Sequence, residues 1–167
     1  MSSRSVIHTA MLIVAVCVLI AGCSRPVVRS DGQQPGMPGF RGPHLGGQVS
    51  EREIEALQAN LKPIYFDYDQ FTLSLESQQT LQANAEILKR ANVAVVAEGH
   101  CDERGTAEYN LALGDRRARS AVEYLAGAGV QPDRLSTVSY GSELPVDPSH
   151  NEAAWSKNRR VHLRVAR

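Results

Sequence analysis

A run of five apolar residues at positions 93–97 limits the folds open to this chain more than any other feature. Polar residues bound the run, and its length suits a β-strand covered on both faces. Such a strand is central in a sheet and is compatible with parallel pairing. Amphipathic helices are predicted before it, over 74–91, and after it, over 107–126. This alternation predicts helices packed against a mixed sheet.

The remaining predicted elements extend this layered arrangement. Strands are predicted over 64–68, 135–140 and 160–165, and one or two helical turns over 151–157. The last strand alternates between an apolar and a polar side, which indicates an edge-like or half-exposed position. A capping-box sequence that begins at Ser50 starts a short amphipathic helix before the first strand. The predicted fold class is α/β (α+β): a βαβαβ(α)β sandwich with helices packed on a mixed four-stranded sheet.

Arg117 occupies a position on the long predicted helix where core and solvent are expected to meet. It shares one stripe of the helix with Asn110 and Leu113, because the three residues are spaced three and four apart. A neighbouring stripe is apolar and is expected to face the sheet: Leu111, Ala118, Val122 and Leu125. A partly desolvated guanidinium needs an anion, and Asp102 is the candidate, although a purely structural ion pair is equally compatible with this spacing.

The first 22 residues have the composition of an export signal. An apolar run over 10–21 is shorter than the roughly 20 residues that a comfortable membrane span needs. Small residues then precede Cys23, and residues 19–23 (LIAGC) resemble the bacterial lipobox, in which a lipid is attached to the cysteine thiol and the signal is cut just before it. An ordinary signal peptide or a short membrane anchor is the alternative. Ser24 after the cysteine favours the outer membrane, by resemblance to lipoprotein sorting in Gram-negative bacteria.

The segment that follows Cys23 is poor in residues that could build a core. It contains four prolines and six glycines within residues 24–49, a density that breaks helices and strands alike. We expect a flexible tether. The chain therefore divides into a signal peptide (1–22), a lipidated cysteine with its tether (23–49) and one folded domain (50–167).

Charge and cysteine content exclude several classes of protein. The chain has 18 basic and 18 acidic residues, so it lacks the basic surplus of a generic nucleic-acid binder. Its three cysteines are an odd number, which does not fit a disulfide framework. If Cys17 leaves with the signal and Cys23 is lipidated, only Cys101 remains as a thiol, and we expect it to pack as a small buried residue.

Several long motifs carry a family resemblance. Residues 98–118 (EGHCDERGTAEYNLALGDRRA) resemble the signature of the OmpA-like peptidoglycan-binding domain family, and within it the peptidoglycan-associated lipoproteins. Segments 65–69, 138–141 and 151–160 match the same pattern, so that the resemblance covers about residues 61–167. Departures are small: Cys101 stands where Ala or Thr is expected, and Trp155 stands where Tyr is usual.

The resemblance implies non-catalytic binding of the stem peptide of peptidoglycan. The family's ligand is meso-diaminopimelate, which presents carboxylate and ammonium groups together. Asp102 and Arg117 occupy the family's central positions: a guanidinium fork can hold a carboxylate, while Asp102 pairs with the ammonium. Five further positions match residues that line the groove: Phe66, Asp67, Arg104, Asn110 and Leu113.

The resemblance also implies a place and partners in the cell envelope. It describes an outer-membrane lipoprotein whose periplasmic domain tethers the membrane to the wall. It further implies binding to the propeller protein TolB within the Tol–Pal system, with a role in envelope integrity and cell division. The family indicates that the wall and TolB use overlapping surfaces. No cofactor is implied.

Other activities fit the residues less well. His100 and Cys101 could be taken as a nucleophilic pair, but adjacent residues at a strand end point in alternate directions. A metal site that adds Asp102 and His162 lacks a known ligand spacing. A wall hydrolase needs paired carboxylates or a zinc motif, and neither is evident. Arg116 and its neighbour at 119 are expected to be solvated rather than to bind nucleic acid.

Overall fold

The computed structural model describes residues 49–166. The predicted signal peptide, Cys23 and all of the predicted tether except Val49 lie outside the described residues. Within the described part, no helix is both long enough and apolar enough to span a bilayer.

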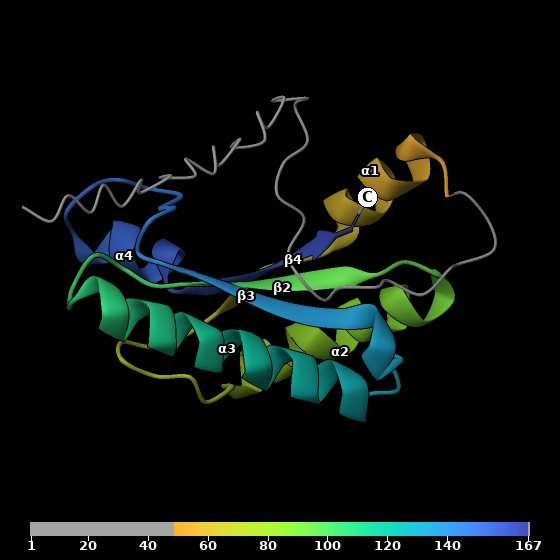
Figure 1. Cartoon of the computed structure of the whole chain (residues 1–167), viewed down its shortest axis with the longest axis horizontal. Coiled ribbons are helices and arrows are strands. Elements are labelled where there is room, and N and C mark those ends of the chain that lie inside the picture. The colour runs from red at the N-terminus through yellow and green to blue at the C-terminus, as the bar shows by residue number, and fades with distance from the viewer. Residues whose placement is uncertain (1–48, 167) are drawn as a thin grey trace, which may run out of the picture. The chain divides into compact units, whose positions relative to one another are not determined.

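A mixed four-stranded sheet forms the centre of the domain, as predicted. The elements in chain order are α1 (Glu51–Asn60), β1 (Ile64–Tyr65), α2 (Leu75–Arg90), β2 (Val95–His100), α3 (Ala107–Gly127), the 3-10 turn η1 (Pro132–Arg134), β3 (Leu135–Gly141), α4 (Glu152–Asn158) and β4 (Arg160–Val165). The strand order is β1-β4-β2-β3. Strand β2 is parallel to β3 and antiparallel to β4, and β1 is antiparallel to β4. Helices α2 and α3 lie along one face of the sheet, while α1 and α4 lie at its opposite ends (Figure 1).

Of the two positions predicted for the last strand, the edge-like one is wrong, because β4 lies between β1 and β2. The half-exposed one fits, since Arg164 on the polar side of β4 is exposed. Its alternation is real: Val161, Leu163 and Val165 are buried against the helices. Its polar side is satisfied within the sheet, since Arg164 Nε donates to Glu98 Oε1 on β2 over 2.5 Å. The alternation of polarity therefore predicted the two faces of β4 correctly, but it could not predict which strands pair with β4.

The strand ends also differ from the prediction. Strand β2 begins at Val95 and continues to His100, and it is central, as the apolar run predicted. Strand β1 is only two residues long, although Phe66 N still donates to Arg159 O over 3.0 Å. The chain then turns at Asp69, which has φ 58°. This early departure of β1 from the sheet frees the segment around Asp69 to form part of a pocket.

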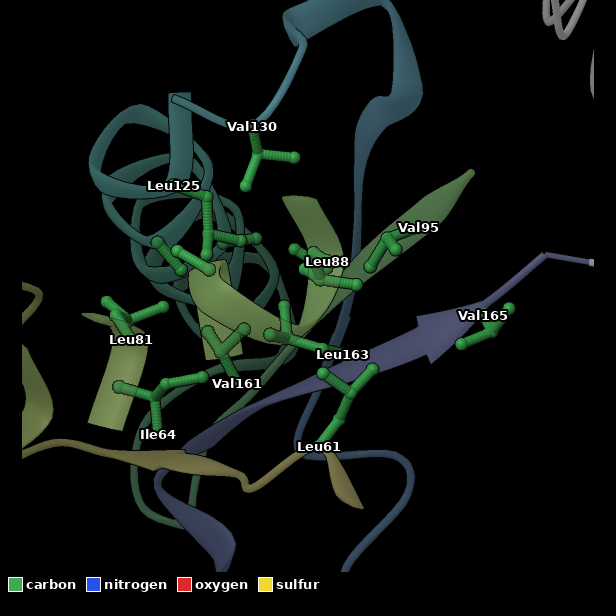
Figure 2. Packing of buried hydrophobic residues seen from close by; sticks show 14 of the residues in the cluster. Leu61, Ile64, Leu81, Leu88, Val95, Leu125, Val130, Val161, Leu163 and Val165 are labelled. Atoms are coloured by element: carbon green, nitrogen blue, oxygen red, sulfur yellow. The ribbon is translucent and has the colours of Figure 1, made fainter. Parts of the chain in front are cut away.

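The hydrophobic core fills the space between the sheet and helices α2 and α3. Side chains from both helices and from three strands converge there (Figure 2): Ile64, Leu81, Leu88, Val95, Leu125, Val161 and Leu163. All of these are at most 1% exposed, and burial of each such side chain contributes about 1.5–3 kcal/mol.

The sheet-facing side of α3 is displaced from its predicted position. Leu111, expected to face the sheet, is 44% exposed, whereas Arg117 is completely buried instead of lying at the boundary. The cause is a close approach of α3 to β2. A Cβ added to Gly99 would lie 1.9 Å from Gly114 O, so only glycine allows this contact. The contact draws the stripe of Asn110 and Arg117 onto the end of β2.

Local signals place the helix starts as expected. Ser50 and Glu53 form the predicted capping box, and the Thr106 side chain accepts from Tyr109 N, as an N-cap does. Helix α1 is held to the sheet by Gln58, whose side chain donates to Leu163 O (2.8 Å) and accepts from Val165 N (2.9 Å). These two bonds continue the β4 ladder where the short β1 ends.

Candidate ligand-binding site

A pocket of about 410 Å³ opens beyond the carboxyl end of β2. We call it the charged pocket, and its lining comes from the β1–α2 loop, the β2–α3 loop and α3: Tyr68, Asp69, Cys101, Asp102, Arg104, Gly105, Thr106, Tyr109, Asn110, Leu113 and Arg117. Five of the seven residues predicted to bind ligand are among them: Asp102, Arg104, Asn110, Leu113 and Arg117. The loops at the ends of sheet strands thus bring together residues far apart in the chain.

The other two predicted residues, Phe66 and Asp67, lie behind the charged pocket rather than in its lining. Both line a second hollow of about 370 Å³. They nevertheless contact Arg117: its guanidinium carbon lies 5.3 Å from the centre of the Phe66 ring, and its Nη2 donates to Asp67 O over 3.2 Å. Their contacts with the charged pocket are therefore made through Arg117.

Arg117 is held entirely by neutral partners. Its Nε donates to Gln70 O over 2.7 Å, and its Nη1 donates to His100 O over 2.9 Å and to Cys101 Sγ over 3.4 Å. With the bond to Asp67 O, four of its five N–H groups have partners. Among residues 49–166, no carboxylate forms a salt bridge with it. The ion pair between Asp102 and Arg117 that the spacing left open is therefore absent from the described structure.

The electrostatic consequence is an uncompensated buried cation. Burial lowers the pKa of Arg117, yet a guanidinium stays protonated in proteins. A positive charge in such a position is costly unless an anion approaches it. The charged pocket is the route by which an external anion can do so.

Asp102 is buried and held by other arginines. Arg104 donates to it through its backbone N (3.1 Å), Nε (3.1 Å) and Nη2 (2.7 Å), and Arg159 Nη1 donates over 3.3 Å. Burial by itself raises the pKa of the Asp102 carboxyl. The side-chain and backbone hydrogen bonds from Arg104 and the side-chain bond from Arg159 outweigh burial, so the pKa lies below its usual value. Asp102 is therefore a carboxylate at neutral pH.

Helix α4 supports this network from the side. The guanidinium of Arg104 lies between the rings of Tyr68 and Trp155, at 4.0 and 4.2 Å from their centres. Glu152 on α4 accepts from Arg159 Nη2 over 2.7 Å and lies 3.7 Å from Arg104 Nη1. Stacking on two rings fixes the orientation of Arg104 and so the direction of the Asp102 carboxylate.

Several residues at the site were not predicted. Asp69 and Tyr109 both line the charged pocket, and the Tyr109 hydroxyl donates to the Asp69 carboxylate. Arg159 contacts Asp102 across 57 residues of chain. Asp69 and Arg159 lie within segments that match the family pattern, and that match was the signal that could have found them. Asp69 adds a second carboxylate, so the pocket presents two anions and two cations and is suited to a zwitterion.

Cys101 and His100 do not form a catalytic pair. Cys101 is buried, as predicted, and its Sγ donates to Asn110 O over 3.3 Å. Burial raises the pKa of this thiol, which keeps it protonated and inert. The His100 ring stacks on Tyr140, and neither of its nitrogens has a hydrogen-bond partner within the described residues.

Comparison with known proteins agrees with this geometry. The family model described as OmpA family matches residues 65–159. The peptidoglycan-associated lipoprotein of Pseudomonas aeruginosa is 45% identical over 120 residues, covering 72% of this chain and 70% of that protein. That of Agrobacterium fabrum is 38% identical over 156 residues, covering 92% of this chain and 85% of that protein.

Solved structures give the same answer for the fold. The crystal structure of the peptidoglycan-associated lipoprotein from Burkholderia pseudomallei matches with a TM-score of 0.61 and 40% identity, over 63% of this chain and 90% of that chain. The C-terminal domain of Helicobacter pylori MotB matches with a TM-score of 0.60 and 24% identity, over 64% of this chain and 84% of that chain, which supports the fold alone. The chain belongs to the OmpA family and, within it, to the peptidoglycan-associated lipoproteins.

Proposed function

We propose that this protein is an outer-membrane lipoprotein that binds peptidoglycan non-covalently and tethers the outer membrane to the cell wall. The observation that carries the proposal is the buried Arg117, whose positive charge has no carboxylate partner among residues 49–166 and faces the charged pocket. The names of the relatives from Pseudomonas aeruginosa and Agrobacterium fabrum, which describe association with peptidoglycan, support the same conclusion. The role is binding rather than catalysis.

The ligand is meso-diaminopimelate of the stem peptide. Its side-chain carboxylate would approach Arg117, whose one N–H without a partner, on Nη2, can donate a hydrogen bond to it and whose charge attracts it. Its ammonium would lie among the carboxylates, Asp102 and Asp69. Asp102 already accepts four hydrogen bonds, whereas Asp69 accepts from Tyr109 alone among the described side chains. Asp69 therefore has more capacity for a new donor.

The anchor lies outside the described residues. We propose that Cys23 is lipidated after removal of residues 1–22, and that the segment up to residue 49 spaces the domain from the membrane. Several acyl chains on one cysteine give nearly permanent attachment, since each buried methylene contributes about 0.8 kcal/mol. Metabolic labelling with a fatty acid should label the wild type and not Cys23→Ala; label that survives the substitution would contradict the anchor.

A protein partner fits the rim of the same pocket. Tyr68 and Tyr109 border the charged pocket and are 57% and 45% exposed, and exposed aromatic residues are typical anchors of protein interfaces. We propose TolB as this partner, within the Tol–Pal system and its role in cell division. If the surfaces overlap, added TolB should release the protein from purified wall; simultaneous binding would contradict the overlap.

Co-sedimentation of the full-length chain, in detergent, with purified peptidoglycan tests the central proposal. The wild type should sediment with the wall. Arg117→Lys and Asp102→Asn should each weaken binding by roughly 30-fold or more, because disrupting one member of a buried charged contact costs about 2–5 kcal/mol. Arg134→Lys is a control, since Arg134 is buried but lies outside the charged pocket. Unchanged binding by both site variants would refute the pocket, and release of soluble wall fragments would indicate a hydrolase.

A further inference from the structure

Glu103 stands between two residues of the site, Asp102 and Arg104, but it lines neither the charged pocket nor the second hollow. Its side chain contacts α4 and the segment before it instead. Its Oε1 accepts a hydrogen bond from Trp155 Nε1 over 2.9 Å, and its Oε2 lies 2.6 Å from His150 Nδ1. These bonds join the β2–α3 loop to residues 52 and 47 positions further along the chain. The role proposed for the charged pocket makes no use of them.

The contacts of Glu103 add little to the stability of the fold. The hydrogen bonds from His150 and Trp155 lower the pKa of its carboxyl and outweigh the smaller effect of burial, so it is a carboxylate at neutral pH. The Glu103 side chain is 44% exposed and that of His150 is 79% exposed, and pairs exposed to this degree contribute little to the free energy of unfolding. We therefore expect their effect in the geometry of the site rather than in stability.

The indole of Trp155 is held at two places by neighbouring residues of one loop. Its Nε1 donates to Glu103, and the face of its ring lies against the guanidinium of Arg104, 4.2 Å from the ring centre. Rotation of the ring would break the hydrogen bond, so Glu103 fixes the plane of the indole. The indole in turn orients Arg104, which donates to Asp102 through Nε (3.1 Å) and Nη2 (2.7 Å). A path of contacts thus runs from Glu103 to the carboxylate in the charged pocket.

We propose that Glu103 is a positioning residue for ligand binding in the charged pocket. It fixes Trp155, and through Trp155 and Arg104 it fixes the direction of Asp102 without contacting the ligand itself. This inference rests on the proposed function, in which Asp102 lies near the ammonium group of the stem peptide. Side chains that are already oriented lose less conformational freedom when a ligand binds, so loss of the acceptor at Glu103 should weaken binding.

Calorimetry of the full-length chain in detergent with the tripeptide L-Ala-γ-D-Glu-meso-diaminopimelate tests this role. Glu103→Leu removes the acceptor and should weaken binding about fivefold, which corresponds to one net hydrogen bond. Glu103→Gln removes the charge but keeps an amide oxygen that can accept from the indole, so its affinity should stay within about twofold of the wild type. Equal losses in the two variants would overturn the role, because Glu103 would then act through its charge.

Glu108, in the first turn of α3, provides a matched control. It is an exposed glutamate that does not line the charged pocket, and its side chain forms no hydrogen bond or salt bridge within residues 49–166. Glu108→Leu removes the same charge near the same site and should leave tripeptide affinity unchanged. A loss equal to that of Glu103→Leu would contradict a specific role for Glu103. Thermal denaturation should show that both leucine variants are folded at the temperature of the titration.

Tryptophan fluorescence provides a second readout of the same role. The chain contains a single tryptophan, so the emission reports on Trp155 alone. Glu103→Leu should increase the fast component of the anisotropy decay, because the indole loses its hydrogen bond, whereas Glu103→Gln should not. An anisotropy decay in Glu103→Leu equal to that of the wild type would overturn the proposal, since other contacts would then fix the ring.

A double-mutant cycle tests the path from Glu103 through Trp155. Trp155→Phe keeps a ring for Arg104 but removes the N–H donor, and it should weaken tripeptide binding about as much as Glu103→Leu. Because both substitutions remove the same hydrogen bond, the double variant should bind no more weakly than either single variant. Additive losses would overturn the path. A wild-type chain that does not bind the tripeptide would instead refute the proposed function, and with it the role of Glu103.

Discussion

Two buried arginines, near opposite ends of β2, have similar surroundings but different roles. Arg134 donates to Val93 O and Leu88 O, and Arg117 donates to His100 O and to carbonyls of the β1–α2 loop. Burial lowers the pKa of both guanidinium groups. The difference is access: Arg117 lines the charged pocket, and Arg134 lines neither hollow described above. A buried arginine is therefore a site candidate only where its charge can reach a ligand.

The largest expected effect separates these two arginines. Arg117→Ala and Arg134→Ala should each lower the free energy of unfolding by about 2–4 kcal/mol, because each leaves buried carbonyl groups without donors. Only Arg117→Ala should also abolish sedimentation with peptidoglycan. Thermal denaturation and wall binding, both measured on the full-length chain, check the two parts. Loss of wall binding in a folded Arg134→Ala variant would contradict the claim that only the arginine in the charged pocket contributes to binding.

A second prediction concerns the close approach that carries α3 onto β2. Gly99→Ala should destabilise the domain by about 3 kcal/mol and weaken wall binding, because the new Cβ would lie 1.9 Å from Gly114 O and push α3 away. Gly127→Ala is the matched control at the end of α3, since its Cβ would meet nothing within 4 Å. The control should leave binding unchanged and raise stability by up to about 1 kcal/mol. Chemical denaturation curves distinguish the two, and equal effects would contradict the role assigned to Gly99.

The smallest effect depends on pH and involves the carboxyl end of β2. Burial, with smaller contributions from Arg160 and His162, lowers the pKa of His100 from 6.5 to about 4. The unfolded chain therefore takes up the proton first, so this contribution to stability is complete above pH 6.5 and is lost as pH falls towards 4. The loss should be about 2 kcal/mol.

His100→Phe isolates that contribution. The variant keeps a ring to stack on Tyr140 and has no nitrogen to protonate. The difference in unfolding free energy between variant and wild type should grow in favour of the variant between pH 6.5 and 4. A difference that stays constant over this range would show that His100 does not titrate as its burial requires.

Much of the fold followed from local patterns. The capping box at Ser50 and the two long helices predicted over 74–91 and 107–126 depend on neighbouring residues alone, and the structure confirms them. The position of β4 inside the sheet could not be predicted in this way, because its neighbours are chosen by packing. The exposure of Leu111 was missed for a similar reason, since it follows from a contact between Gly99 and Gly114.

The candidate site likewise contains some contacts that are local in the sequence and others that join distant segments. Asp102 and Arg104 are two residues apart, and the motif that contains them is enough to predict a charged loop. The contacts of Asp102 with Arg159, and of Tyr109 with Asp69, join segments 57 and 40 residues apart. Such contacts arise only when β4 and the β1–α2 loop meet at the end of β2. The neutral surroundings of Arg117, which give the site its unpaired charge, likewise depend on the three-dimensional arrangement of distant segments.

The most direct test of the central claim compares two stem peptides that differ by one carboxylate. One contains meso-diaminopimelate and the other contains L-lysine at the same position, so only the group expected to reach Arg117 is removed. Calorimetry with the full-length chain should show at least a tenfold preference for the diaminopimelate peptide, and Arg117→Lys should reduce that preference. Equal affinity of the wild-type protein for both peptides would contradict the account.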